Sequence, residues 1–328
     1  MNIQAMNIQK ELQKYNPTLS LDELVVEVNK IYHSFEAEVY DQNHPEVMQQ
    51  LPPIWKVMVD KFIKKNKDIY ILDYGCGTGF ESQQVINNVP PDQLKHITLF
   101  DTSKEMLQKC KDKFKTYPFD VKFICESDKI YSESDLKYNI LLTNSLLHHL
   151  PQPFETIAKL EKFLADDCIW FCGHEPSKRF YQNEHCLSLL NEYRRARKVR
   201  LFLTPSHVLR KIKHELGFDT GIAAKTAQEC LKQGLFTERP KSAIIGLIVD
   251  YHVAHSREEA KTGRGFCFQE IEKELARKWN LAWKTTYSFM GSFYEGSLPE
   301  KWQQKCRDLA EKYPDDGANF SSVWTRSI

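Results

Sequence analysis

The stretch 71-ILDYGCGTG-79 places three glycines, separated by single residues, directly after a short apolar segment. Residues 68–75 are rich in β-branched and aromatic side chains, which favour a buried strand. Glycine has no side chain, so the backbone here can take left-handed conformations or lie directly against a ligand. A buried strand that ends in bare backbone predicts a ligand-binding loop at the carboxyl end of that strand.

Segments with strand and helix patterns alternate downstream of this loop. Such alternation is typical of a parallel sheet whose two faces are both covered by helices. The predicted strands are 68–75, 96–101, 120–127, 138–145, 168–176, 281–289 and 319–327, and the predicted helices between them include 81–89, 104–114 and 153–164. The sequence therefore predicts an α/β fold built on a seven-stranded, mostly parallel sheet.

The alternation is interrupted in the middle of the chain. Helical and irregular patterns fill residues 177–266, and an ordered connection of this length is usually functional, often as a lid. Residues 1–68 are also predicted to be helical, and Ser20 and Glu23 have the spacing of a capping box. We expect four parts: an N-terminal helical segment over 1–68 that contributes to a cap, a cofactor-binding core over 69–176, a helical insert over 177–266 that covers the substrate, and the C-terminal part of the core sheet over 267–328.

The composition excludes several classes of protein. The 328 residues carry a formal net charge of +1, which provides no global positive field for nucleic acid or an anionic membrane. No run approaches 18 apolar residues, and the N-terminus lacks the apolar core of a signal peptide. Nine cysteines are scattered without a Cys-x-x-Cys pair, which fits reduced thiols better than a disulfide framework or a zinc site. We expect a cytoplasmic protein with no membrane, nucleic-acid or metal partner.

Three ligand classes can explain a glycine loop after a first strand. A nucleoside triphosphate site needs GxxxxGK[ST], and no Lys-Ser or Lys-Thr follows this loop. A dinucleotide site needs GxGxxG, whereas the third glycine here is Gly79 and the next residue is Phe80. A nucleoside that carries an amino acid, S-adenosylmethionine, remains. Asp73 is expected to serve its ammonium, directly or through water, and Asp101 its ribose hydroxyls.

The motifs ILDYGCGTG, LFDTS, ESD and YNILLTNSLLHHLP, in this order and spacing, resemble the motif series of class I S-adenosylmethionine-dependent methyltransferases, in the branch that acts on small molecules. The resemblance is close over 69–176 and weaker over the last two strands. It implies a Rossmann-like fold, S-adenosylmethionine as cofactor, S-adenosylhomocysteine as product and a small-molecule substrate. It implies that the methionine part lies against Asp73, Gly75, Cys76, Gly77 and Gly79, the ribose against Asp101 with Thr102 and Met106 beside it, the adenine against Ser127 and Asp128, and the reactive methyl near Asn144 and Ser145. Tyr32 and Tyr40 are the candidates for closing over the cofactor from the N-terminal helices.

Methyl transfer is an in-line displacement at a sulfonium, so the protein must align the acceptor and remove a proton where the acceptor carries one. His148 and His149 are predicted to begin the helix after the fourth strand, at the rim where the methyl should lie. His174 and Glu175 end the fifth strand at the same rim. We predict that proton removal or acceptor orientation falls to His149 first, then to His148 and Glu175.

Two further polar clusters have less specific patterns. His252 and His255 share a helical face and Asp250 is nearby, but no third and fourth metal ligand is identifiable by spacing, so a polar patch in the lid is predicted. The basic run over 194–200 suits phosphate or carboxylate recognition, and its amphipathic surroundings favour a solvated helix face instead.

Other functions stay open on the sequence alone. Nucleic-acid amino-methylation is disfavoured, because Asn144-Ser145-Leu146-Leu147 stands where such enzymes carry Asn/Asp-Pro-Pro-Tyr. Aminopropyl transfer from a decarboxylated cofactor is compatible with the fold, although an acid at position 73 suits the intact amino acid. A binding or scaffold protein without catalysis is disfavoured by the intact glycines. The expected function is methyl transfer to an oxygen, nitrogen or carbon atom of a small molecule.

Overall fold

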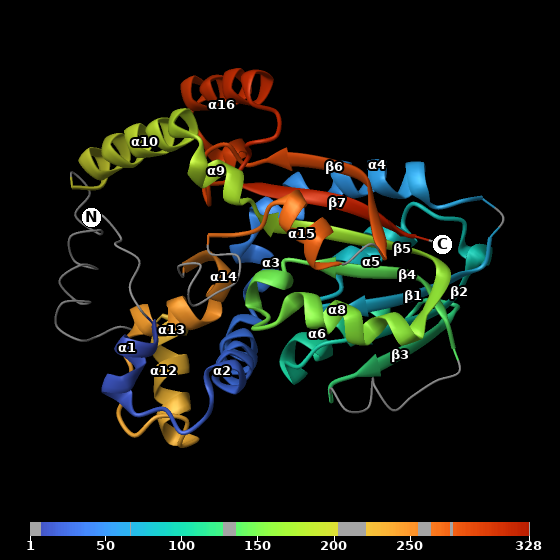
Figure 1. Cartoon of the computed structure of the whole chain (residues 1–328), viewed down its shortest axis with the longest axis horizontal. Helices are drawn as coiled ribbons and strands as arrows, with labels where there is room; N and C mark the ends of the chain where they lie inside the picture. Colours follow the sequence, from blue (N-terminus) through green and yellow to red (C-terminus); the bar gives the residue numbers. More distant parts are fainter. Residues whose placement is uncertain are drawn as a thin grey trace.

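A seven-stranded sheet forms the centre of the protein (Figure 1). The structure is a computed structural model that describes residues 8–65, 67–126, 136–202, 221–254, 264–275 and 278–327. The strands are β1 Ile69–Tyr74, β2 Leu94–Phe100, β3 Asp120–Ile124, β4 Tyr138–Asn144, β5 Leu164–Pro176, β6 Trp279–Tyr287 and β7 Asn319–Arg326. Their order across the sheet is β3-β2-β1-β4-β5-β7-β6.

The first five strands are parallel, and β7 runs antiparallel to its neighbours β5 and β6. This arrangement confirms the predicted mostly parallel α/β sheet. The chain order reverses where β4 follows β1 in the sheet, because β2 and β3 lie on one side of β1 and the later strands lie on the other. Ligands of open parallel sheets bind outside the carboxyl ends of the strands at such a reversal.

Helices cover both faces of the sheet, which explains why its strands are almost continuously apolar. One face packs against α4 Pro52–Phe62, α5 Phe80–Ile86 and α6 Lys104–Phe114, and the other against α8 Pro153–Leu160 and α15 Phe268–Glu274. Trp55 and Phe171 meet in the first core, while Trp170 and Trp324 stack in the second. All four side chains are fully buried, and full burial of one large apolar side chain stabilises a fold by about 1.5–3 kcal/mol.

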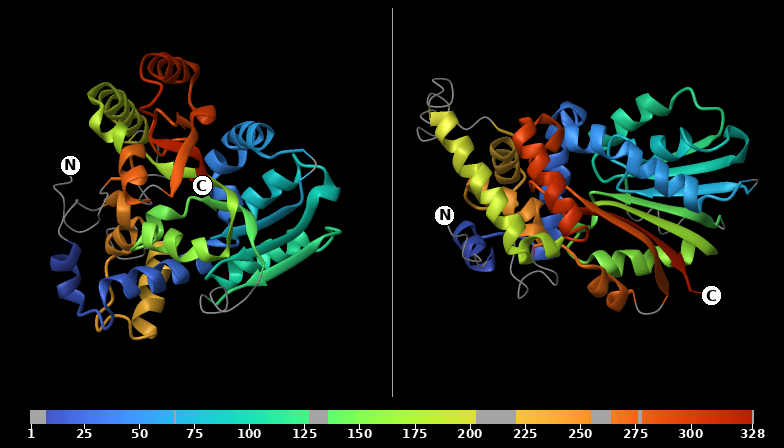
Figure 2. Two further views of the ribbon diagram at one scale, coloured as in Figure 1. Left: turned by 45° about the vertical axis from the view of Figure 1, so that its right-hand side comes forward. Right: turned by 90° about the horizontal axis from the view of Figure 1, so that it is seen from above.

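A group of helices from two distant parts of the chain lies at one end of the sheet (Figures 1 and 2). It comprises α1 Ile8–Leu12, α2 Leu21–Glu36, α12 Ile222–Lys232, α13 Ser242–Val249 and α14 Tyr251–Ala254. Leu24, Val28 and Ile31 of α2 share one apolar cluster with Ile245 and Ile248 of α13. We call these five helices the cap. The capping box predicted at the start of α2 is present, with both reciprocal bonds between Ser20 and Glu23.

The first part of the predicted insert packs elsewhere. It forms α9 Lys178–Gln182 and α10 Glu184–Phe202, which share an apolar cluster with α16 Glu300–Lys312 beside the end of β7. The basic run over 194–200 lies in α10, and its side chains from Arg194 to Lys198 are exposed, as a solvated helix face requires. Residues 203–220 of the predicted insert and the residue His255 lie outside the described residues.

Short helices complete the path. They are α3 Tyr40–Asn43, the π-helical turn Glu46–Gln50, and 3-10 turns at Gln13–Tyr15, Pro91–Gln93, Leu147–His149, Glu161–Phe163 and Glu295–Ser297. His148 and His149 therefore do not begin the helix after β4, as the sequence predicted. They end a separate 3-10 turn, and α8 starts only at Pro153, since a proline lacks the N–H that a helix interior needs. Among the described helices, none combines the length and apolar character needed to cross a bilayer.

Candidate active site

A cavity of about 780 Å³ lies between the carboxyl ends of the strands and the cap. The strand ends contribute Gly75, Gly77, Asp101, Asn144 and His174 to its wall. Helices α2 and α3 and the end of α13 contribute Tyr32, Tyr40, Val249 and Asp250, among other residues. The predicted ligand edge of the sheet therefore forms one wall of a cavity, and the N-terminal helices and the insert form its other walls.

The glycine loop after β1 uses its three glycines in different ways. All three have positive φ, 82° at Gly75, 50° at Gly77 and 86° at Gly79, a conformation that L-residues with side chains rarely adopt. A Cβ at Gly75 would lie 2.6 Å from Leu146 Cδ1, and one at Gly79 would lie 2.7 Å from Phe114 Cε2. A Cβ at Gly77 would meet no atom within 4 Å. Gly75 and Gly79 thus permit close packing, whereas Gly77 leaves space open.

Asp101 joins the glycine loop to the end of β2. Its Oδ2 accepts a hydrogen bond of 2.8 Å from the Gly77 N–H, and its Oδ1 accepts one of 2.8 Å from the Ser103 N–H. Burial raises the pKa of the Asp101 carboxyl above its ordinary value, and these two N–H groups oppose that effect. Thr102 and Met106 line the cavity beside it. A carboxylate so placed retains lone pairs that can accept hydrogen bonds from a ligand.

Asp73 lies beneath the loop rather than in the cavity wall. It is fully buried, and its Oδ2 accepts a bond of 2.5 Å from Ser82 Oγ in α5. Burial raises its pKa to about 7, and the buried Glu81 beside it is raised as well. The side chain thus faces α5, which does not match the direct contact with a ligand ammonium that the sequence suggested. Cys76 is also buried and is not among the residues that line the cavity. Asn144 and Ser145 do line the cavity.

Ser127 and Asp128, the predicted adenine contacts, lie outside the described residues. The N-terminal candidates are described, and Tyr32 and Tyr40 both line the cavity. Asp41, next to Tyr40, accepts a bond of 2.7 Å from Thr78 Oγ1 of the glycine loop and pairs with Lys113 of α6 at 2.7 Å. These contacts dock α3 onto the loop. That the two tyrosines close over a cofactor stays a prediction.

A chain of alternating imidazoles and carboxylates runs along the cavity wall beside Tyr40, and the sequence analysis missed it. Glu36 bonds His33 Nδ1 at 3.0 Å and His44 Nε2 at 3.1 Å, and His44 Nδ1 bonds Glu46 at 2.8 Å. Burial alone would raise the pKa of Glu36, but the two imidazoles lower it to about 2. Burial alone would lower the pKa of His44, but the two carboxylates raise it to about 9. The only sequence signal was the one-turn spacing of His33 and Glu36.

His174 and Glu175, predicted to share the rim, point to different places. The β5–β7 register shifts between Cys172 and Glu175, and His174 has a φ of 52°. A bulge of this kind re-aims the side chains that follow it. His174 consequently lines the cavity, where burial lowers its pKa to about 4. Glu175 is fully buried away from the cavity.

The Glu175 carboxylate holds the turn that carries the two histidines. Its Oε1 accepts 2.8 Å bonds from the N–H groups of Leu146 and Leu147. Its Oε2 accepts from the His148 N–H at 3.3 Å and pairs with His148 Nδ1 at 2.9 Å. The prediction that Glu175 acts on the acceptor is corrected by this geometry: all its contacts go to the turn, and it positions His148.

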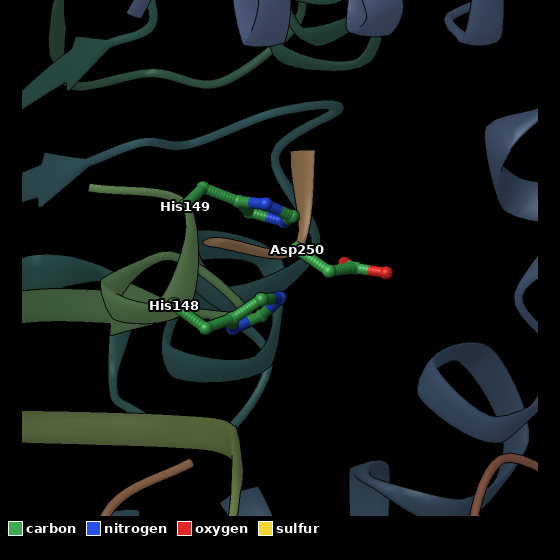
Figure 3. Close-up of side chains that lie close together, drawn as sticks. All are labelled: His148, His149 and Asp250. Atoms are coloured by element: carbon green, nitrogen blue, oxygen red, sulfur yellow. The ribbon is translucent and has the colours of Figure 1, made fainter. Parts of the chain in front are cut away.

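His148 and His149 reach the cavity, where Asp250 joins them (Figure 3). Their ring centroids are 3.9 Å apart, and the potential ligand atoms of the three residues all lie within 4.8 Å of one another. His149 Nδ1 bonds the Val249 carbonyl at 2.7 Å. Burial lowers the pKa of His149 well below its ordinary value, so the ring is neutral near pH 7. Burial also acts to lower the pKa of His148, but Glu175 raises it above the ordinary value.

The sequence analysis noted Asp250 only as a neighbour of His252 and His255 and assigned this cluster to a polar patch in the lid. His252 is instead buried, and its Nε2 bonds the Leu150 carbonyl at 2.8 Å. Together with the bond between His149 and Val249, this contact ties the end of α13 to the turn after β4. The cap is therefore fixed to the sheet edge at the point where the two cavity imidazoles stand.

Comparison with known proteins identifies the part of the chain that carries the glycine loop. Residues 65–190 match the family model described as "Methyltransferase domain". This segment is a methyltransferase domain. The sheet order, the loop after β1 and the acid at the end of β2 are the features of the domain on which the predicted resemblance depended, and the resemblance is confirmed.

The methyltransferase domain also has curated relatives. The chain is 30% identical over 121 residues to the malonyl-[acyl-carrier protein] O-methyltransferase of Halalkalibacterium halodurans, a match that covers 36% of this chain and 43% of that protein. It is 28% identical over 131 residues to the protein of the same name from Bacillus anthracis, covering 40% of this chain and 46% of that protein. The chain thus matches less than half the length of these relatives.

A solved structure of the plantazolicin methyltransferase BpumL in complex with SAH aligns over 98% of this chain and 99% of that chain, at 14% identity and a TM-score of 0.46. A likeness of this size carries no conclusion about activity.

Proposed function

We propose that this protein transfers a methyl group from S-adenosylmethionine to a small molecule inside the cavity between the sheet and the cap. The observation that carries the proposal is that one cavity is lined both by the glycine loop with Asp101 and by the imidazoles of His148 and His149. Its volume of about 780 Å³ falls within the roughly 300–1,000 Å³ that is usual for small-molecule sites.

The residues at the strand ends fit such a cofactor. Gly77 presents bare backbone to open space, and the Asp101 carboxylate beside it can accept hydrogen bonds from hydroxyls. Asn144 lines the same wall, and its Oδ1 has no hydrogen-bond partner among the described residues. That oxygen lies against Gly173, where a Cβ would be only 2.3 Å from it, so packing rather than a ligand fixes the amide. When bound, S-adenosylmethionine supplies the electrophilic methyl group and the leaving group.

The histidines at the other end of the cavity are assigned to the acceptor. His149 is neutral near pH 7, and its Nδ1 is engaged by a carbonyl that only accepts, so its Nε2 carries a lone pair. That nitrogen can receive or orient the proton of an acceptor. Glu175 fixes the ring of His148 beside it. The cap lies over the sheet edge beside these histidines, and its residues can hold the acceptor aligned with the methyl donor.

The acceptor itself is set by residues outside the matched domain, because Asp250 and the walls from α2 and α13 lie outside residues 65–190. The curated relatives are all named O-methyltransferases, which favours an oxygen atom as the acceptor. We therefore assign a small oxygen acceptor to the cavity.

Two glycine variants test the cofactor assignment. Gly77 and Gly234 both have positive φ, 50° and 73°, and a Cβ at either would meet nothing within 4 Å. Valine imposes similar backbone strain at both, about 1–2 kcal/mol, but only Gly77 lines the cavity. Gly77→Val should abolish binding of S-adenosylhomocysteine in calorimetry, while Gly234→Val binds it normally. Undiminished affinity in a folded Gly77→Val protein would sink the proposal.

The acceptor is sought with labelled S-adenosylmethionine and small-molecule pools. Label should enter a small molecule with the wild-type protein and not with Asp101→Ala. Label that enters only protein or nucleic acid would contradict the assignment of a small acceptor.

A further inference from the structure

We propose that His148, His149 and Asp250 form a binding site for a divalent transition-metal ion at the acceptor end of the cavity (Figure 3). The ion would hold an oxygen atom of the acceptor. The choice of acceptor rests on the proposed function, whereas the cation site rests on the contacts of these three side chains alone. The sequence predicted no metal site, because His148 and His149 are separated from Asp250 by about a hundred residues.

The hydrogen bonds of the two imidazoles leave one nitrogen of each ring, Nε2, available to bind a cation. His148 Nδ1 faces the Glu175 carboxylate at 2.9 Å, and His149 Nδ1 faces the Val249 carbonyl at 2.7 Å. Both partners are acceptors, so each Nδ1 carries the proton and each Nε2 carries the lone pair when the ring is neutral. Metal-binding histidines almost always donate their second N–H to a carboxylate or a backbone carbonyl in this way.

Asp250 supplies the anionic ligand. It follows the last residue of α13, and its side chain is accessible from the cavity. It has no side-chain hydrogen bond or ion pair with the described residues. In Figure 3 its carboxylate and the two rings project from the ribbon toward the same side. The carboxylate is therefore available to a cation at little cost.

The three side chains must move slightly toward one another to bind a single ion. An ion equidistant from three atoms 4.8 Å apart would lie 4.8 divided by √3, or about 2.8 Å, from each, and metal–nitrogen and metal–oxygen bonds measure about 2.0–2.2 Å. Each side chain would move inward by roughly 0.7 Å. Asp250 can do so by side-chain rotation, since no hydrogen bond or ion pair with the described residues holds its carboxylate.

The donor set indicates the kind of ion. Two imidazole nitrogens and one carboxylate suit zinc, manganese, iron or cobalt, whereas magnesium and calcium prefer oxygen ligands throughout. All three ligands come from the turn after β4 and the adjoining end of α13, so the opposite side of the ion would face the cavity. Three protein ligands with an open position are typical of catalytic rather than structural sites.

An ion at this place selects an oxygen acceptor. A bound hydroxyl would have a lowered pKa and release its proton to water. The resulting oxygen lone pair then forms the new O–C bond, while the electrons of the breaking C–S bond remain on sulfur. An amine would donate the lone pair it needs for methylation to the ion. In the cation-loaded protein, His148 and His149 thus serve as ligands rather than as proton acceptors.

Manganese binding tests the site. The protein is stripped with chelator, and uptake of Mn²⁺ is followed by loss of the EPR signal of the free ion. Mn²⁺ binds thiolates poorly, so the nine cysteines do not interfere. We expect one ion per chain, and at least about tenfold weaker binding in Asp250→Asn, as loss of a metal-site interaction typically produces. Asp22→Asn, which also removes a carboxylate from the cavity wall, should bind as the wild type does.

The outcomes separate this inference from the proposed function. Wild-type binding no tighter than that of Asp250→Asn, or an equal loss in Asp22→Asn, overturns the cation site. His149→Asn is a second variant with a ligand removed, and normal Mn²⁺ affinity in it has the same consequence. S-adenosylhomocysteine binding is measured on the same stripped samples. Cofactor binding without Mn²⁺ binding overturns the cation site only, and Mn²⁺ binding without cofactor binding overturns the methyltransferase proposal only.

Discussion

Replacing Glu175 with glutamine should destabilise the whole fold, although the substitution removes only a charge and keeps the shape of the side chain. The carboxylate is fully buried and accepts bonds from four N–H groups: three from the backbone of residues 146–148 and one from the His148 ring. A glutamine has one carbonyl oxygen and one NH₂ group. If the NH₂ group faces Leu146 and Leu147, two buried N–H groups lose their partner. If it faces His148, the ring can move its proton to Nε2 and accept through Nδ1, so at least the backbone N–H of His148 loses its partner.

The expected magnitude follows from this count. A buried polar group left without its hydrogen bond costs about 1–3 kcal/mol, so one or two such groups cost about 1–6 kcal/mol. That is a large part of the 5–15 kcal/mol by which a typical domain is stable. The destabilised turn also carries His148 and His149, so Tm should fall and the cavity histidines should lose their fixed orientation.

The assay is guanidinium unfolding at pH 7, monitored by tryptophan fluorescence. Glu300→Gln is the matched control, because its side chain is 77% exposed and a surface change of this kind alters stability by less than about 0.5 kcal/mol. If the free energy of unfolding of Glu175→Gln falls by less than about 1 kcal/mol with an unchanged denaturant slope, the argument that Glu175 satisfies the N–H groups of the turn is refuted.

Two other changes give defined outcomes. Asp101→Asn should weaken S-adenosylhomocysteine binding by about tenfold or more, since hydrogen bonds to a charged group contribute about 1.5–3 kcal/mol. The control Asp112→Asn, on the exposed side of α6, should bind normally in the same calorimetry. Equal affinities of the two variants would remove Asp101 from the cofactor site. The folded pKa of His44 is about 9 against an ordinary 6.5, so its stabilisation is complete below pH 6.5 and is lost as the pH rises through 9. Melting curves of wild type and His44→Gln should converge across that interval, and curves that stay parallel would contradict the pairing of His44 with Glu36 and Glu46.

The local features of this protein were predictable because each depends on neighbours in the chain. The capping box at Ser20 and Glu23 needs only a spacing of three residues. The glycine loop is recognisable in the sequence from Gly75 and Gly77, since few other residues tolerate positive φ. Asp101 could be placed beside the loop because parallel strands bring their carboxyl ends to one edge.

Side-chain direction at the ends of the strands was not predictable. His174 and Glu175 are adjacent in a strand, so simple alternation already sends them to opposite sides, but which one faces the ligand depends on the bulge after Cys172 and on the positive φ of His174. A bulge depends on pairing with β7, which is formed from the far end of the sequence. The role of Glu175 as a support for the turn is therefore a property of the assembled sheet.

The sequence by itself determined the sheet, the order of its elements and the edge at which a ligand binds. Periodicity and the placement of glycines can both be recognised within short segments of the chain. Only the tertiary structure decided which polar groups meet there. Asp250 reaches His148 and His149 because α13 packs on α2 and its last carbonyl, that of Val249, accepts a hydrogen bond from His149. Contacts between residues so far apart depend on how apolar faces dock, and no local pattern encodes that docking.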